Sequence, residues 1–261
     1  MYNCKQFLSL LEGFAPLSLS QKMIEKGSYD NSGLLIKNHD RIQKILFTLD
    51  LNEQAVSVAK ELCCDTIVTH HPAIFTPISE IGVSTSTKTV LDAVKGNLNV
   101  FSMHLNLDIA KDGIDQSLSL GLKGKNQKVV EVFDGELGYG KQADVDCIDI
   151  EEYVEQIKKE FGSNKVIYYG QGVVERIASF CGSGSKDALK AVETGSIEAD
   201  TIITSDIPHH VLLGLIETGK KVIILPHYVA ENYGFNKFYA NIKNAVTDDV
   251  KAYYFTDKRF M

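Results

Sequence analysis

Histidines and a carboxylate follow two short apolar runs of this chain. Residues 65–69 lead directly into His70 and His71, and residues 99–103 lead into His104, with Asp108 four positions later. Neutral imidazole is the commonest metal ligand in proteins, and mixed imidazole and carboxylate donors suit several divalent ions. These residue types at these places predict a metal site. For His70 and His71 taken alone, a pair of loop histidines without a ligand is an equal alternative.

A third apolar run, residues 221–225, is followed by His227 and Glu231. On a helix, residues four positions apart lie on the same face. The pair therefore has the geometry of two metal ligands, although the same spacing also occurs by chance on solvated helices.

Together these three places offer more donors than one tetrahedral ion with an open position needs. They suit two ions bridged by a carboxylate, as in two-metal hydrolytic sites. The candidate ligands are His70, His71, His104, Asp108, His227 and Glu231.

The elements that must position these residues are strands alternating with helices. The apolar runs read as short buried strands, and helical patterns cover residues 53–62, 87–95 and 114–122. Such alternation predicts α/β domains with mixed sheets flanked by helices, and ligand sites of these sheets lie at the carboxyl ends of strands. Neighbouring strand residues point to opposite faces, so His70 and His71 can share a site only where the chain bends, and Pro72 ends the strand there.

The second half of the chain shows the same alternation, with a glycine-rich link at residues 134–140. Gly121 and Gly124 mark a boundary, which predicts one domain from residues 1–124 plus 226–261 and another from residues 125–225. A loop between a strand and a helix contains Gly182, Ser183, Gly184 and Ser185. Its backbone N–H groups could hold an anion, but the spacing matches no P-loop or dinucleotide fingerprint, so a plain tight turn is the alternative.

Composition excludes several classes of protein. The chain has 261 residues, of which 44% are hydrophobic and 23% charged, and a formal net charge of −7 without a lysine or arginine cluster. Direct nucleic-acid binding is therefore not expected, nor is a membrane span. The N-terminus lacks the pattern of a secretory signal, and five cysteines without a CxxC motif are expected to be reduced and mostly buried. These features predict a cytoplasmic protein and exclude a thiolate zinc finger.

The sequence resembles the Nif-three-like dinuclear metal-binding proteins, also called GTP cyclohydrolase I type 2 homologues. The matching stretches occur in the family's order over nearly the whole chain. They are DNSGLLI (30–36), THHPAIF (69–75), HLNLDIAKDGID (104–115), FCGSGS (180–185), TSDIPHH (204–210) and HYVAENYGF (227–235). The chain has no room for the inserted domain of some members, so it is similar to the short form.

The resemblance implies two divalent ions per chain, of zinc, iron, manganese or nickel. It places His70 and Asp108 on one ion, His71 and His227 on the other, and Glu231 between them. It also implies the Nif-three-like fold and a toroidal homohexamer. Tyr29 stands where a tryptophan is common in the family, a departure that touches no proposed ligand.

We therefore expect a metal-dependent hydrolase that acts on a nucleotide or a related heterocycle, with ring opening of GTP as the named possibility. The resemblance leaves His104 as a ligand, a partner of a ligand or a proton carrier. His104, or the pair His209 and His210, is expected to carry protons. The loop from Gly182 to Ser185, with His209 and His210, is expected to bind substrate. The rival is a non-catalytic metal-binding scaffold or metal chaperone, which would use the same ligands. A regulatory protein that binds DNA or a transcription factor is a third possibility, and the net charge disfavours direct DNA contact.

Overall fold

The computed structural model describes residues 1–84 and 87–261, and the chain divides into two compact units. Unit 1 comprises Met1–Ala110 and Phe235–Asp257, and unit 2 comprises Lys111–Gly234 and Lys258–Met261. The long helix α10 (His227–Ala245) therefore contributes residues to both. The bounds expected from the sequence, 1–124 plus 226–261 and 125–225, stay a prediction.

Unit 1 is built on a five-stranded mixed sheet in the order β1-β4-β3-β2-β11. Strands β4, β3, β2 and β11 run parallel to one another, and β1 is antiparallel to β4. Both β3 and β4 are buried at every position, as expected for strands covered on both faces. The strands are β1 (Gly33–Ile36), β2 (Lys44–Thr48), β3 (Thr66–Thr69), β4 (Asn99–Ser102) and β11 (Lys251–Tyr254).

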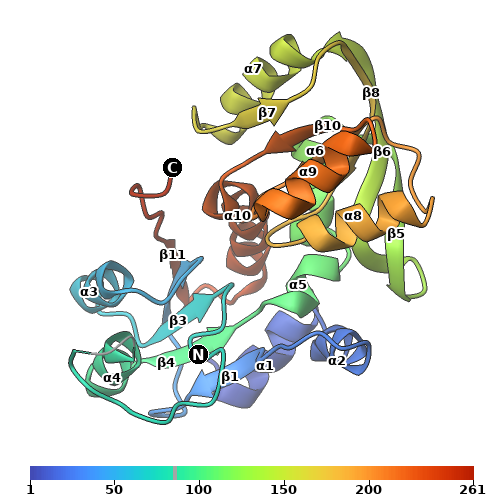
Figure 1. The fold of residues 1–261 in the computed structure, drawn as a ribbon. Coiled ribbons are helices and arrows are strands. Elements are labelled where there is room, and N and C mark those ends of the chain that lie inside the picture. Colours follow the sequence, from blue (N-terminus) through green and yellow to red (C-terminus); the bar gives the residue numbers. More distant parts are fainter. Residues whose placement is uncertain (85–86) are drawn as a thin grey trace. The chain divides into compact units, whose positions relative to one another are not determined.

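Helices flank this sheet, and α3 and α4 pack against each other beside it (Figure 1). The Asn52 side chain accepts a hydrogen bond of 2.9 Å from the backbone N–H of Ala55, so Asn52 caps α3 as its position before the helical pattern predicts. The helices are α1 (Cys4–Glu12), α2 (Leu17–Glu25), α3 (Glu53–Glu61), α4 (Lys88–Lys95) and α5 (Leu105–Ile109).

Unit 2 contains a six-stranded mixed sheet in the order β5-β6-β8-β9-β10-β7. The central pairs β8–β9 and β9–β10 are parallel, whereas β5–β6, β6–β8 and β10–β7 are antiparallel. The strands are β5 (Lys125–Asp134), β6 (Leu137–Asp149), β7 (Ile167–Tyr169), β8 (Val173–Ser179), β9 (Thr201–Thr204) and β10 (Lys221–Ile224).

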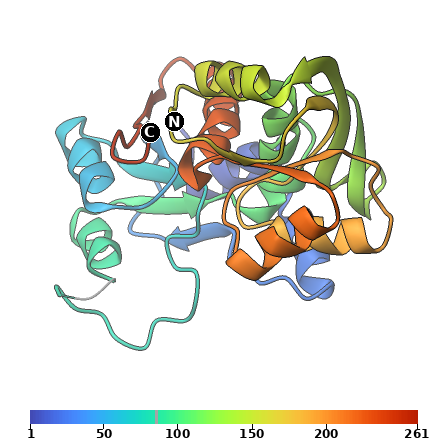
Figure 2. The ribbon, with the colours of Figure 1, turned by 45° about the horizontal axis from the view of Figure 1, so that its top comes forward.

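Helices α6 to α9 lie entirely within unit 2, and α8 and α9 lie side by side (Figure 2). Asp149 caps α7 through a hydrogen bond from the N–H of Glu151, and Gly162 ends the helix in the left-handed conformation. The helices are α6 (Ile114–Gly121), α7 (Ile150–Phe161), α8 (Ser185–Glu193) and α9 (His209–Glu217).

The prediction of a glycine-rich link at residues 134–140 is wrong for most of that segment. Only Gly135 and Glu136 form a turn, and Leu137 begins the long strand β6. Gly138 lies against the backbone of Glu131, and Gly140 has φ +72° with its Cα facing the ring of Phe180. These two glycines are needed because the Glu131 backbone and the Phe180 ring lie too close for a side chain. Such close contacts occur in strands as well as in loops.

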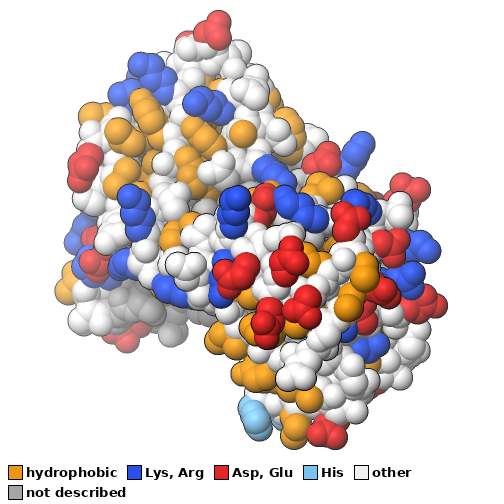
Figure 3. All heavy atoms as spheres, turned by 90° about the horizontal axis from the view of Figure 1, so that it is seen from above, with side chains coloured by type: hydrophobic (Ala, Val, Ile, Leu, Met, Phe, Trp, Pro, Cys, Tyr) orange, Lys and Arg blue, Asp and Glu red, His pale blue; other side chains and the backbone are white. Residues whose placement is uncertain are grey.

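The fold class is confirmed as two mixed α/β sheets flanked by helices. Sequence patterns did not reveal α2, β11, the full length of α10, or the short helix α5 after His104. No helix among the described residues is long and apolar enough to span a bilayer. On the face shown in Figure 3, lysine and arginine side chains are interspersed with aspartate and glutamate.

Candidate metal centre

The chain bends sharply where β3 ends. The backbone N–H groups of His70 and His71 both donate to the carbonyl oxygen of Leu49, over 3.1 and 3.0 Å. Because of this bend the two side chains do not point to opposite faces, and their ring centroids lie 4.9 Å apart. His70 is fully buried and His71 is partly exposed, so the expected bend is present.

The neighbouring strand β4 brings a third imidazole to the same place. His104 precedes the short helix α5, and its ring lies 5.2 Å from that of His70. One ligand atom from each of His70, His71 and His104 can be chosen so that all lie within 4.8 Å of one another. Asp108 lies one helical turn beyond His104, with Oδ1 3.4 Å from Nε2 of His70. Parallel strands ending at one sheet edge thus gather these donors within unit 1.

Each imidazole of this group is oriented by an oxygen at Nδ1. His70 Nδ1 lies 2.8 Å from the carbonyl oxygen of Met103, His71 Nδ1 2.6 Å from Asp50, and His104 Nδ1 2.7 Å from Asp30. A carbonyl or carboxylate oxygen only accepts, so Nδ1 carries the proton and the neutral ring presents the Nε2 lone pair. This arrangement is typical of metal-ligating histidines.

Unit 2 repeats this arrangement on helix α10. His227 Nδ1 lies 2.7 Å from Asp206 Oδ2, and His227 Nε2 lies 2.9 Å from Glu231 Oε2. The helical i,i+4 geometry expected for His227 and Glu231 is therefore present. Glu231 is almost fully buried, and a buried carboxylate is stable only beside positive charge or several donors.

The Cys181–Gly184 turn passes directly over Glu231. Gly182 has φ +59°, and a Cβ placed on it would meet Glu231 Oε1 at 2.5 Å and the ring of His227 at 3.5 Å. Only glycine combines this conformation with such an approach. Gly182 is therefore required by the proximity of the carboxylate within unit 2.

A buried ion pair anchors the same turn. Asp115 accepts a 3.2 Å hydrogen bond from the N–H of Cys181, and its other oxygen lies 3.2 Å from the ammonium nitrogen of Lys141. Tyr139 donates to the carbonyl oxygen of Cys181. Burial raises the pKa of Asp115 above its ordinary value, while the charge of Lys141 acts to lower it. These contacts fix the backbone that faces Glu231.

The charge of Asp30, the partner of His104, is stabilised by hydrogen bonds. Burial acts to raise its pKa, but hydrogen bonds from His104, Ser20 and Ser32 outweigh burial and hold the pKa below its ordinary value. The Ser32 hydroxyl also accepts a 3.1 Å hydrogen bond from the N–H of His104. Asp30 thus stays ionised and holds the proton of His104 on Nδ1.

The residues expected to bind substrate have different environments. Ser183 donates to Asp206 Oδ2 over 3.1 Å, and Ser185 is buried at the start of α8. Gly184 packs against the Tyr139 hydroxyl and Phe180. The two histidines at the start of α9, His209 and His210, are exposed. The substrate roles of these residues stay predictions.

Sequence reasoning missed the residues that orient the ligands. Asp50 lies two residues after β2 and Asp206 two residues after β9, close to the strand-end positions that pointed to the histidines. Asp30 lies in the stretch Asp-Asn-Ser-Gly, whose residue types are typical of a turn. Asp115 and Lys141 lie far apart in the sequence, and their pairing depends on how α6 packs on β6.

The chemistry of the donors fits divalent metal ions. In each unit a lone pair on a histidine Nε2 faces a carboxylate oxygen, at 3.4 Å for His70 and Asp108 and at 2.9 Å for His227 and Glu231. Two acceptors placed this close repel each other, and a cation shared between them would relieve the repulsion. Imidazole and carboxylate together favour zinc, iron, manganese or nickel over calcium or magnesium.

Comparison with known proteins identifies relatives over the full length of the chain. A family model described as Duf34/NIF3 (NGG1p interacting factor 3) matches residues 2–259. A Lactococcus lactis protein named GTP cyclohydrolase 1 type 2 homolog is 32% identical over 233 residues, covering 86% of this chain and 87% of the relative. A Clostridium perfringens protein of the same name is 29% identical, covering 94% of this chain and 92% of the relative.

A solved structure has the same fold. The crystal structure of a Bacillus cereus protein related to NIF3 superimposes with a TM-score of 0.85 at 18% identity, covering 98% of this chain and 97% of that one. At this level of identity the likeness concerns the fold.

Proposed function

The chain belongs to the Duf34/NIF3 family, and from this premise we propose that it is a dinuclear metal-dependent hydrolase acting on a nucleotide or a related heterocycle. The observation that carries the proposal is the orientation of its histidines. His71, His104 and His227 each have Nδ1 held by a carboxylate and present Nε2 as a ligand or a base. A chance cluster of surface histidines has no reason to share this arrangement.

In this proposal two divalent ions would be held by the residues that the family resemblance implies. His70 and Asp108 would hold one ion and His71 and His227 the other, with Glu231 shared. The fit is supported by donor type and by the facing pairs within each unit. When bound, such ions supply Lewis acidity and lower the pKa of a coordinated water. The ion is zinc, iron, manganese or nickel, since the donors accept any of these.

His104 is the proposed proton carrier. Asp30 accepts the Nδ1 proton over 2.7 Å, so Nε2 is the atom that takes a proton from a reacting group or returns one. The His104 side chain is 16% exposed, which lets a ligand reach it. We assign Gly182 to Ser185 to substrate positioning, together with His209 and His210, on the strength of the family motifs alone.

Family resemblance also underlies the proposed surroundings. We propose that the chain assembles as a toroidal homohexamer and works in the cytoplasm on a small molecule. Three of the cysteines, Cys4, Cys64 and Cys181, are buried, which agrees with thiols kept for packing in a reducing compartment.

The test is turnover by the metal-loaded protein. Purified protein reconstituted with each candidate metal is incubated with a panel of nucleotides and related heterocycles, and products are identified by mass spectrometry. We expect one substrate class to be hydrolysed, and expect the activity to vanish in His71→Gln. The control is His39→Gln, which changes a histidine of unit 1 that lies outside the ligand group. Metal bound at full occupancy without turnover of any compound would favour the scaffold or chaperone instead.

A further inference from the structure

Two exposed aromatic rings stand together beside the histidines of unit 1. Tyr29 and Phe75 are 51% and 46% exposed, and their rings meet edge to face with centroids 5.1 Å apart. Single exposed aromatics are common on protein surfaces. A contacting pair of aromatic residues that are each about half exposed offers a surface on which another flat molecule can lie.

The pair is fixed relative to His104. The Phe75 ring lies 6.1 Å from the His104 ring at an interplanar angle of 88°. Asn31, two positions after Tyr29, donates a 2.5 Å hydrogen bond to the carbonyl oxygen of Ile74, next to Phe75. Tyr29 also directly precedes Asp30, which holds His104. Hydrogen bonds on both sides therefore tie the aromatic pair to the histidine.

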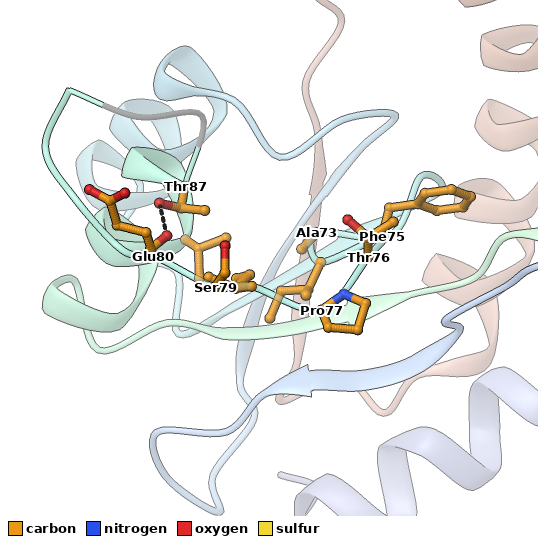
Figure 4. Close-up of a pocket in the computed structure, with 10 residues that line it drawn as sticks. Ala73, Phe75, Thr76, Pro77, Ser79, Glu80 and Thr87 are labelled. Atoms are coloured by element: carbon orange, nitrogen blue, oxygen red, sulfur yellow. Dashed lines mark hydrogen bonds between the residues drawn. The ribbon is translucent and has the colours of Figure 1, made fainter.

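A hollow of about 400 Å³ runs along the same segment. Its lining extends from Ala73 and Phe75 to Glu80, Thr87 and Val90, so Phe75 lies at one end of it. Figure 4 shows the Phe75 ring extending away from the end of the segment where Thr87 donates to the carbonyl oxygen of Glu80. The ring is thus presented outward instead of being packed into its own loop.

We propose that Tyr29 and Phe75 form a stacking platform for a planar heteroaromatic ring of the ligand, such as a purine. A ring stacked there adjoins His104, so its polar edge can reach a proton donor or acceptor while its faces contact only aromatic carbon. An aliphatic ligand would gain less from two exposed rings than a flat aromatic one. This inference rests on the proposed function and names the part of the substrate that the platform recognises.

The experiment measures binding separately from turnover. The metal-loaded protein is titrated with guanosine monophosphate, adenosine monophosphate and ribose 5-phosphate, which lacks a base. We expect both nucleotides to bind more tightly than ribose 5-phosphate. Phe75→Ala should weaken nucleotide binding about 5- to 150-fold, the range that stacking of one base on one aromatic side chain represents. Binding of ribose 5-phosphate and metal content should not change.

The platform also predicts a gain. The chain contains no tryptophan, so Tyr29→Trp introduces a single fluorophore with a larger π face. We expect this variant to keep or strengthen nucleotide binding and its emission to be quenched by the nucleotides but not by ribose 5-phosphate. The matched control is Ile81→Ala, which removes an exposed apolar side chain, 57% exposed, from the same connecting segment, and which should leave binding unchanged.

Three results would overturn the platform. The first is absence of nucleotide binding at millimolar concentration. The second is equal weakening of nucleotide and ribose 5-phosphate binding by Phe75→Ala. The third is unchanged nucleotide binding by Phe75→Ala together with a shifted elution volume, which would place the rings in a subunit contact. Failure of the proposed function would appear in separate measurements, as absent metal or absent turnover. Those measurements do not depend on the ratios of nucleotide to ribose 5-phosphate binding.

Discussion

The chemistry proposed for this chain depends on the Nδ1 atoms of the candidate ligand histidines. An oxygen at Nδ1 selects the tautomer and orients the ring, and this choice decides whether Nε2 can act as a ligand. Asp50 does so for His71 and Asp206 for His227. These aspartates are therefore as much part of the candidate centre as the histidines.

Replacement of Asp50 tests this statement. Asp50→Ala removes the acceptor at His71 Nδ1, and we expect metal affinity to fall about 10- to 100-fold, as for other outer partners of ligating histidines. Asp50→Asn keeps an acceptor oxygen without the charge, so its metal affinity should lie between those of the parent chain and Asp50→Ala. Competition with a chromogenic chelator gives the affinities. Asp248→Ala, at an exposed position of the same unit, is the control, and equal affinity in Asp50→Ala and this control would show that Asp50 does not support a ligand.

The buried pair of Asp115 and Lys141 makes a second prediction about single residues. Lys141→Met removes the cation and leaves a fully buried carboxylate, so we expect the free energy of unfolding to fall by about 3–5 kcal/mol. Adding Asp115→Asn should restore most of the loss. The comparison is Lys125→Met, which breaks a 2.7 Å pair with Asp146 between largely exposed side chains and should cost less than about 1 kcal/mol. Urea unfolding measures both, and equal losses would contradict the account.

At the scale of elements, the candidate metal donors follow the ends of strands, and the Cys181–Gly184 turn holds the Glu231 carboxylate in place. Gly182→Ala puts a methyl group where Glu231 Oε1 lies and also strains a positive φ. Gly195→Ala has the same kind of strain, at φ +68°, with no atom near the added methyl group. Both should lose roughly 1–2 kcal/mol of stability, but only Gly182→Ala should lose metal. Metal content after desalting decides, and full occupancy in Gly182→Ala would show that the turn does not position Glu231.

Three strands of unit 2 share one carboxylate, which makes stability depend on pH. Burial acts to raise the pKa of Asp200, but hydrogen bonds from Thr201, Lys221 and the N–H groups of Arg176 and Glu175 hold it below its ordinary value. A carboxylate whose pKa is lower in the folded than in the unfolded protein stabilises the folded state at pH values above its unfolded pKa of ~3.9. This contribution to the free energy of unfolding is lost as the pH falls through the pKa of the folded state.

Asp200→Asn should therefore be less stable at pH 7 by about 1–3 kcal/mol and should lose less additional stability on acidification than the parent chain. Unfolding in denaturant at a series of pH values checks the difference. A constant difference between the two proteins down to the acid limit would contradict the lowered pKa of Asp200.

At the scale of the whole molecule, the fold class and the ligand-bearing strand ends were predictable from the sequence, and much of what supports them was not. Apolar runs ending in His70 and His104 are local signals, and His227 and Glu231 follow helical spacing. Asp115 meets Lys141 only after the chain has folded. Gly234 lies inside helix α10, although glycine disfavours helices. A Cβ at this position would lie 2.8 Å from the Cα of Ile114, so the close packing requires glycine. Packing, and not helix propensity, therefore decides the length of α10.

The central proposal, which rests on the family resemblance, is that donors from residues 70–108 and from residues 227–231 would hold two ions, with Glu231 shared. Glu231→Gln keeps the volume and one acceptor oxygen but removes the charge that offsets repulsion between two cations. Glu217→Gln, at an exposed position at the end of α9, is the matched control.

The most direct measurement is the metal content of these three proteins, reconstituted with excess divalent metal, desalted and analysed for bound metal per chain. We predict two equivalents of metal for the parent chain and for the control Glu217→Gln. For Glu231→Gln we predict at most one equivalent and an unchanged circular dichroism spectrum. A plateau at one or no equivalent in the parent chain, or two equivalents retained in Glu231→Gln, would contradict the dinuclear centre.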